Sequence, residues 1–197
     1  MKNNNIIWLL IVTATLLIAS CKNSSQDAIK EKRQDEMQNR ENRVSPPAIA
    51  EATIGENTVQ VEYSSPRVKD RPIWGELVPY NEVWRTGANE ATKITFSKDV
   101  LIEGQSLAKG TYSLFSIPSP MPVEWTIIFN VNETQWGAFK YDQSEDALRV
   151  KVKPVLLENL QENLVFEIIP DATNNSGVIR MRWEKMQVDF KFQNAEN

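Results

Sequence analysis

Short runs of alternating apolar and polar residues recur from Ala48 onward, and this period of two is typical of β-strands with one buried face. In the run TVQVEY, Val59 and Val61 share a face with Tyr63. The run WTIIFN is almost wholly apolar, which is typical of a central strand covered on both sides. The pattern predicts strands over residues 58–63, 92–97, 111–117, 125–130, 136–141, 148–153, 164–169, 178–183 and 188–192, and a hairpin over 100–107 that turns at Glu103-Gly104.

This number of strands, without an amphipathic helix, predicts an all-β domain over residues 48–197. We expect a two-sheet antiparallel β-sandwich, with a jelly roll or a closed barrel as alternatives. Residues 64–91 lack the strand pattern and contain three prolines and two glycines. Structureless connections longer than about 15 residues are uncommon in compact domains and usually serve a function.

The N-terminal residues predict export and lipid anchoring. Residues 6–19 (IIWLLIVTATLLIA) are uncharged but shorter than the ~20 residues of a membrane-spanning helix, which favours a signal peptide over residues 1–20. The tetrapeptide that ends at Cys21 (IASC) resembles the lipobox of bacterial lipoproteins. That resemblance implies that Cys21 carries acyl chains such as palmitate, with the membrane as a partner. Lys22 is unlike the aspartate that signals retention in the inner membrane, so we expect an outer-membrane lipoprotein of the cell envelope.

Residues 21–47 are predicted to form a flexible tether. Their charges are dense and nearly balanced, and apolar residues are scarce, so the segment cannot bury enough surface to offset its chain entropy. We expect it to be disordered or at most a frayed, solvated helix. Pro46-Pro47 marks the boundary to the β domain.

Composition excludes several kinds of chemistry. The chain has no histidine, so Ser-His-Asp and Cys-His mechanisms and histidine-based zinc sites are ruled out. Cys21 is the only cysteine, which excludes an internal disulfide. No calcium loop or nucleotide-binding fingerprint is present, so we predict no metal and no cofactor. The chain is acidic, with 22 basic against 26 acidic side chains, which argues against a nucleic-acid partner.

The candidate ligand-binding residues gather in the 64–91 segment, where charged and amide side chains alternate with aromatic rings. A guanidinium fork beside an amide and indole rings suits a sugar ring or a carboxylated glycan. Gly87 is a candidate for a turn at positive φ that brings these groups together. The predicted ligand-binding residues are Trp74, Tyr80, Trp84, Arg85, Thr86, Asn89, Glu90 and Trp136.

A structural interpretation of the same residues competes with this one. In it, Trp84 packs in the core, Arg85 pairs with Glu90, and Thr86 and Asn89 satisfy the loop backbone. Trp125 opens an apolar strand and is expected in the core; if it were exposed with Trp136, the two rings would form a stacking platform.

Several stretches resemble a known family. They are the continuous block from VEYSSPRVKDRPIWGELVPYNEVWRTGANEATKITFSKDV onward, then LAKGTYSLFSIP, EWTIIFN, WGAFKYD, LRVKVKP and a late RWEK. Across about residues 50–192 the chain is similar to domain-of-unknown-function family 2911, and the block WRTGANEAT is quite specific, since generic β-sandwich patterning does not demand it. The resemblance implies a β-rich exported protein or lipoprotein of Gram-negative bacteria, and it implies no activity.

Two classes of function follow from these residues. The first is a non-catalytic binding or structural module that recognises a glycan, a peptide or another envelope protein through the 64–91 segment. The alternative is a hydrolase or lyase for an envelope or extracellular polysaccharide, in which Glu90 would act with Glu82 or Asp70. The sequence assigns no catalytic residue and leaves enzymatic activity and the oligomeric state open.

Overall fold

The computed structural model describes residues 30, 32, 34 and 38–195, and its contacts divide the chain into two units, residues 1–43 and 44–197. The predicted signal peptide, Cys21 and most of the predicted tether lie outside the described residues. Within the tether, residues 38–41 are helical and exposed. In the described part of the chain, no helix has the length and apolar character needed to cross a membrane.

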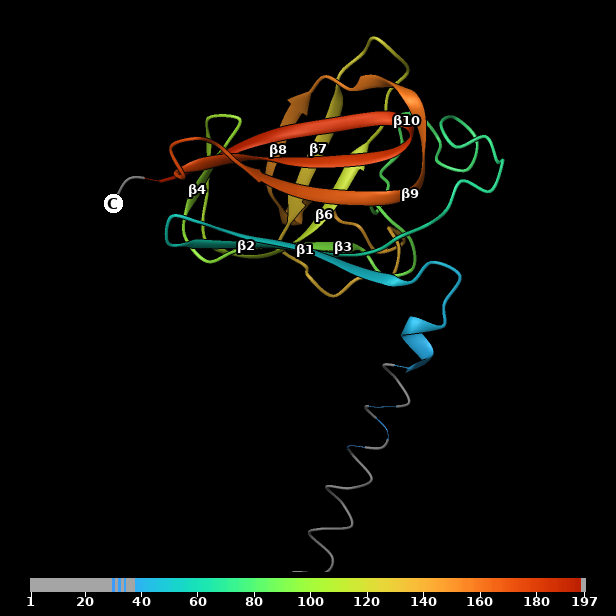
Figure 1. Cartoon of the computed structure of the whole chain (residues 1–197), viewed down its shortest axis with the longest axis horizontal. Helices are drawn as coiled ribbons and strands as arrows, with labels where there is room; N and C mark the ends of the chain where they lie inside the picture. Colours follow the sequence, from blue (N-terminus) through green and yellow to red (C-terminus); the bar gives the residue numbers. More distant parts are fainter. Residues whose placement is uncertain (1–29, 31, 33, 35–37, 196–197) are drawn as a thin grey trace, which may run out of the picture. The chain divides into compact units, whose positions relative to one another are not determined.

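The second unit is a sandwich of two antiparallel sheets, which confirms the predicted all-β fold (Figure 1). Each sheet keeps two edge strands, so the alternative of a closed barrel is not realised. The larger sheet has the order β1 (Pro47–Ile54), β2 (Asn57–Ser64), β3 (Thr92–Phe96), β6 (Gly110–Ile117), β7 (Trp125–Asn130) and β8 (Asp146–Val152). The smaller sheet has the order β5 (Gln105–Leu107), β4 (Val100–Ile102), β10 (Ser176–Asn194) and β9 (Val155–Pro170).

Strand β10 folds back on itself. Arg180 and Asp189 form a 2.7 Å ion pair, although nine extended residues would separate their backbones by about 30 Å. Glu184, midway between them, has a φ of 55°, which turns the chain. β10 therefore supplies two arms to the sheet, seen in Figure 1 as two long ribbons that meet in a bend.

The main core fills the space between the sheets, and a second apolar cluster lies outside it. Every residue of β7 is buried, as predicted for a strand covered on both faces. Ile127 and Phe129 belong to the main core, whereas Ile128 belongs to the second cluster with Ala91 and Phe115. Because side chains alternate along a strand, this second cluster lies on the opposite face of the larger sheet.

Most predicted strands are confirmed, and Glu103-Gly104 forms the predicted turn with both residues at positive φ. The strand predicted over 136–141 is wrong, because Gly137 adopts a φ of 66° and the chain turns there. In this turn Ala138 and Tyr141 pack against the second apolar cluster, and they are three positions apart in the sequence rather than the two expected of a strand. The pattern also missed β1, whose inward face begins with alanines, and the first half of β9.

Candidate functional site

Residues 64–91 are tied to both sheets at several points, although they contain no strand of their own. The Val68 amide donates to the Glu162 carbonyl at 2.9 Å, which joins the segment to β9. Trp84 and Ser116 exchange two backbone hydrogen bonds of 2.8 and 2.9 Å, which joins it to β6. In Figure 1 the segment is the teal-green loop beyond the bend of β10. The connection is therefore a fixed part of the fold.

The tryptophans of this segment pack against the core. Trp84 is buried, and its ring stacks on Trp183 with the centroids 5.8 Å apart and the planes 17° apart. The half-buried Trp74 meets Trp84, Trp183 and Trp125 edge-on at 5.6, 5.7 and 4.8 Å. Trp125 is fully buried, as predicted, so it forms no exposed platform with Trp136. These rings stabilise the end of the sandwich by burial and edge-to-face contact.

The polar residues Thr86 and Asn89 satisfy the loop backbone. The Thr86 hydroxyl lies 3.3 Å from the Trp84 carbonyl and 3.1 Å from the Ser116 hydroxyl. The Asn89 amide donates to the Ser45 carbonyl at 3.1 Å and to the Ser64 hydroxyl at 3.2 Å. Both residues adopt positive φ values, 51° and 58°. These contacts agree with the structural interpretation of the two residues.

Gly87 has a different role from the one proposed for it. The positive φ values of this turn belong to its neighbours Thr86 and Asn89, and Gly87 is not among the residues at positive φ. A side chain at Gly87 would place its Cβ 2.8 Å from the Thr92 hydroxyl. That hydroxyl donates to the Thr86 carbonyl at 2.9 Å. Glycine is required here by the close approach of β3.

Arg85 and Trp74 are the predicted residues with a buried side-chain nitrogen that lacks a hydrogen-bond partner, and of the two only Arg85 is charged. Its guanidinium is half-buried, and its Nε atom is buried without a hydrogen-bond partner. Desolvation lowers the pKa of Arg85. The predicted ion pair with Glu90 is not formed, and no other ion pair involves Arg85 in the described part of the chain. The backbone of Glu90 forms an isolated antiparallel β-bridge with Trp136 of the neighbouring loop.

That neighbouring loop, residues 131–141, brings exposed aromatic rings beside Arg85. The Gly137 amide donates to the Asn89 carbonyl at 3.0 Å. The position of a Cβ on Gly137 would lie 3.7 Å from Nη1 of Arg85 and 2.9 Å from the Phe139 ring, so both groups flank its bare backbone. Phe139 is 85% exposed and Trp136 is 58% exposed. We call Arg85, Glu90, Trp136 and Phe139 the Arg85 surface.

A network of polar side chains beneath this loop holds it in place. The Asp146 carboxylate accepts from the Tyr141 hydroxyl and from Nε of Arg149, both at 2.6 Å, and from the Asn130 amide at 2.9 Å. Burial and the bond to Asp146 raise the pKa of Tyr141 to about 12. Gln135 donates to Asn130 at 3.1 Å, while its Oε1 atom is buried without a partner. The exposed rings therefore stand on a rigid base.

The structure brings together only part of the predicted set. Arg85, Glu90 and Trp136 lie on adjacent loops, whereas Trp74 and Trp84 face the core. Tyr80 packs on Gly75 within its own loop, where a Cβ on Gly75 would come within 2.8 Å of the ring. Phe139 is absent from the predicted site residues because the sequence pattern predicts a strand over residues 136–141. Asp70 and Glu82, the partners considered for a catalytic Glu90, are exposed, and the catalytic interpretation stays a prediction.

Comparison with known proteins identifies a family and no activity. A family model described as "Protein of unknown function (DUF2911)" matches residues 45–192. That range contains the whole Arg85 surface and all strands except the end of β10. No curated protein and no solved structure matches the chain significantly.

Proposed function

Because the chain belongs to the DUF2911 family, whose function is unknown, we propose a role from its own geometry: a non-catalytic module that binds an anionic glycan at the Arg85 surface. The observation that carries this proposal is the half-buried guanidinium of Arg85, which has no ion pair among the described residues and a buried Nε without a partner. A cation removed from water without a counter-charge destabilises the free protein. A ligand carboxylate or sulfate would supply that counter-charge and a planar acceptor for the guanidinium fork.

The exposed rings favour a sugar over a simple anion. Trp136 and Phe139 offer flat apolar faces within the same surface, and such faces stack on the C–H face of a sugar ring. The rigid base under residues 131–141 keeps these rings in position before a ligand arrives, which reduces the entropic cost of binding. An acidic sugar matches both parts of the surface.

Binding to an acidic oligosaccharide tests this proposal. We expect the full chain to bind oligogalacturonate and to ignore a malto-oligosaccharide of equal length in calorimetric titrations. Arg85→Met should weaken binding at least tenfold, and Trp136→Ala should weaken it severalfold. Arg67→Met is the matched control, because Arg67 lies in the same segment but is exposed and paired with Glu162 at 3.3 Å. Equal affinity of Arg85→Met and the unaltered chain would refute the site, and a glycan array without any acidic ligand would refute the ligand class.

We propose further that the module is held at the cell envelope by acyl chains on Cys21. Support comes from the tetrapeptide IASC after an apolar stretch that suits a signal peptide. Several long acyl chains give a stable anchor, since each buried methylene contributes about 0.8 kcal/mol. Labelled palmitate should be incorporated into the chain in a Gram-negative host and lost in Cys21→Ser. Recovery of unlabelled, full-length chain from the cytosol would contradict the anchor.

A further inference from the structure

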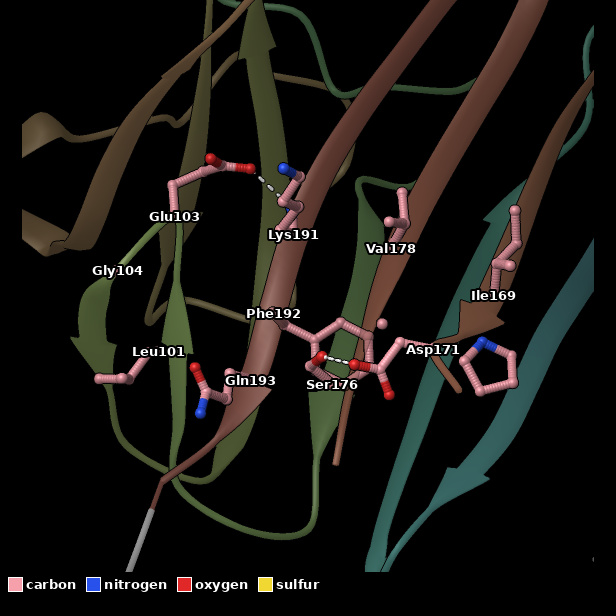
Figure 2. A pocket seen from close by; sticks show the side chains of 12 residues that line it. Leu101, Glu103, Gly104, Ile169, Asp171, Ser176, Val178, Lys191, Phe192 and Gln193 are labelled. Carbon is pink, nitrogen blue, oxygen red and sulfur yellow. Dashed lines mark hydrogen bonds between the residues drawn. The ribbon is translucent and has the colours of Figure 1, made fainter. Parts of the chain in front are cut away.

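A hollow that none of the residues of the Arg85 surface lines lies on the outer face of the smaller sheet. It has a volume of about 430 Å³, which is within the range of small-molecule sites. Leu101 of β4, Ile169 of β9 and Val178 of β10 provide apolar side chains to its lining. Figure 2 shows Val178 between Lys191 and Ile169.

The outward direction of these side chains follows from the strand register. Val178 pairs with Ile169, and the buried residues Gly177 and Ile179 on either side of Val178 face the other way. Gln193 pairs with Leu101 in the same manner, next to the buried Phe192. Leu101, Val178 and Ile169 therefore face away from the core, to which the lining residue Phe192 belongs. Neither the packing between the sheets nor the second apolar cluster accounts for these three residues.

Charges of opposite sign stand at separate edges of this hollow. The ammonium of Lys191 forms no ion pair among the described residues, while its backbone amide donates to the Glu103 carboxylate at 2.6 Å. Asp171 lies in the turn between β9 and β10, where its carboxylate accepts from Ser176 and, at 2.8 Å, from the Thr173 hydroxyl. These bonds lower the pKa of Asp171 to about 2, so it is ionised at neutral pH. Figure 2 shows the contact of Glu103 with Lys191 and that of Ser176 with Asp171 as dashed lines.

The spacing of the two charges sets the length of a complementary ligand. Lys191 lies on the second arm of β10, and the end of β9 that leads to Asp171 lies beyond the first arm. Two strand spacings and an offset of two residues along the strand separate the backbones of Lys191 and Asp171 by about 12 Å. An extended dipeptide spans about 7 Å, and a hydrogen bond at each of its ends adds about 3 Å.

We propose that this hollow binds a dipeptide-sized zwitterion with apolar side chains. The ligand carboxylate pairs with Lys191, the ligand ammonium pairs with Asp171, and the apolar side chains cover Leu101, Val178 and Ile169. Two pairs of charged neighbours on the same face neutralise each other, Arg180 with Asp189 at 2.7 Å and Arg182 with Glu167 at 2.8 Å, while the Glu103 carboxylate accepts from the Lys191 backbone amide. They bound the hollow without competing for the ligand. This site is independent of the glycan-binding proposal.

Titration of the full chain with leucyl-leucine tests the site. We expect saturable binding by calorimetry and at least fivefold weaker binding of N-acetyl-leucyl-leucine amide, which has the same side chains and neither charge. Free leucine should bind more weakly than leucyl-leucine. Lys191→Met keeps the aliphatic stem and should weaken binding at least fivefold. Lys185→Met is the matched control, because Lys185 is exposed at the bend of β10 and outside the hollow, and it should bind normally.

A second variant separates this hollow from any other binding place. Val178→Trp fills the hollow from an outward-facing position and should abolish binding. Near-ultraviolet circular dichroism reports whether the tryptophan cluster of the core is intact in this variant. If that variant does not fold, Gln193→Trp fills the opposite end from an exposed position. Absence of saturable binding up to 10 mM would overturn the proposal, and so would equal affinity for the uncharged analogue or binding that survives in a folded, filled variant.

Discussion

Replacing Arg85 with methionine should stabilise the protein while it removes the glycan site. Methionine keeps a long unbranched side chain and discards the charge. In the native protein the guanidinium is partly desolvated, and its buried Nε has no partner. A buried donor without a partner costs about 1–3 kcal/mol. Because part of the guanidinium remains in contact with solvent, we expect a gain near the lower end, about 1 kcal/mol.

Thermal and urea unfolding at neutral pH measure this effect. For a domain of this size, 1 kcal/mol corresponds to a rise in Tm of roughly 2–5 °C. Arg67→Met is again the control, since its exposed ion pair should contribute less than about 1 kcal/mol. The two variants remove the same charge from the same segment, so any difference between them reports the environment of Arg85.

The opposite sign would refute the reasoning. A loss of 2 kcal/mol or more in Arg85→Met would mean that the guanidinium has a stabilising partner in the folded protein, and the argument for an external anion would fail with it. A gain in stability together with loss of binding would instead identify Arg85 as a residue kept for function at the expense of stability.

Three further predictions concern the framework. Gly87→Ala should destabilise the fold by about 1–3 kcal/mol in urea unfolding, because the new Cβ would displace the Thr92 hydroxyl; an unchanged midpoint would show that the turn can relax. Asn57→Ala should cost about 3 kcal/mol in the same measurement, since the side-chain oxygen of the fully buried Asn57 accepts from the backbone amides of Ser97 and Lys98 at 3.0 and 3.1 Å. Asn57→Asp replaces the amide nitrogen that donates to Asn194 Oδ1 at 2.8 Å with a buried carboxylate oxygen, so it should cost at least as much, and a smaller cost would refute this account. Because the pKa of Tyr141 is raised from 10 to about 12, stability should fall as the pH rises from about 10 to 12, by about 1–2 kcal/mol after allowance for solvent screening, and Tyr141→Phe should remove this part of the slope.

The sequence predicted the strands whose neighbours impose a clear pattern. Residues 125–130 are apolar on both faces because β7 lies between two apolar clusters. The apolar run itself can be read from the amino-acid sequence without the structure. Residues 136–141 show an equally apolar run, but Gly137 turns the chain and exposes Phe139. Alternation in a short run cannot distinguish a strand from a turn that presents some apolar residues to solvent and others to a small cluster.

The alternation of apolar and polar residues does not predict how the two arms of β10 pair, for a related reason. Residues 178–183 and 188–192 were predicted as separate strands, and the chain does reverse between them at Glu184. The register between the two arms of β10, which places Arg180 opposite Asp189, is not specified by any local pattern in the sequence. The dipeptide-sized hollow follows from that register, because it is the register that places Lys191 beside Val178.

The candidate site emerged by elimination of residues that the fold already uses. Trp84, Thr86 and Asn89 were attractive ligand contacts in the sequence, and each has hydrogen-bonding or packing partners within the chain. Any residue type that binds a ligand can equally satisfy a buried backbone, so composition alone cannot separate the two roles. Arg85 differs because it is a charged group that forms no ion pair among the described residues and has a buried Nε without a partner, which only the three-dimensional surroundings can show. On our proposal, the adjacent Phe139 and Trp136 indicate the chemistry of the ligand, which is an anion attached to a flat and partly apolar group.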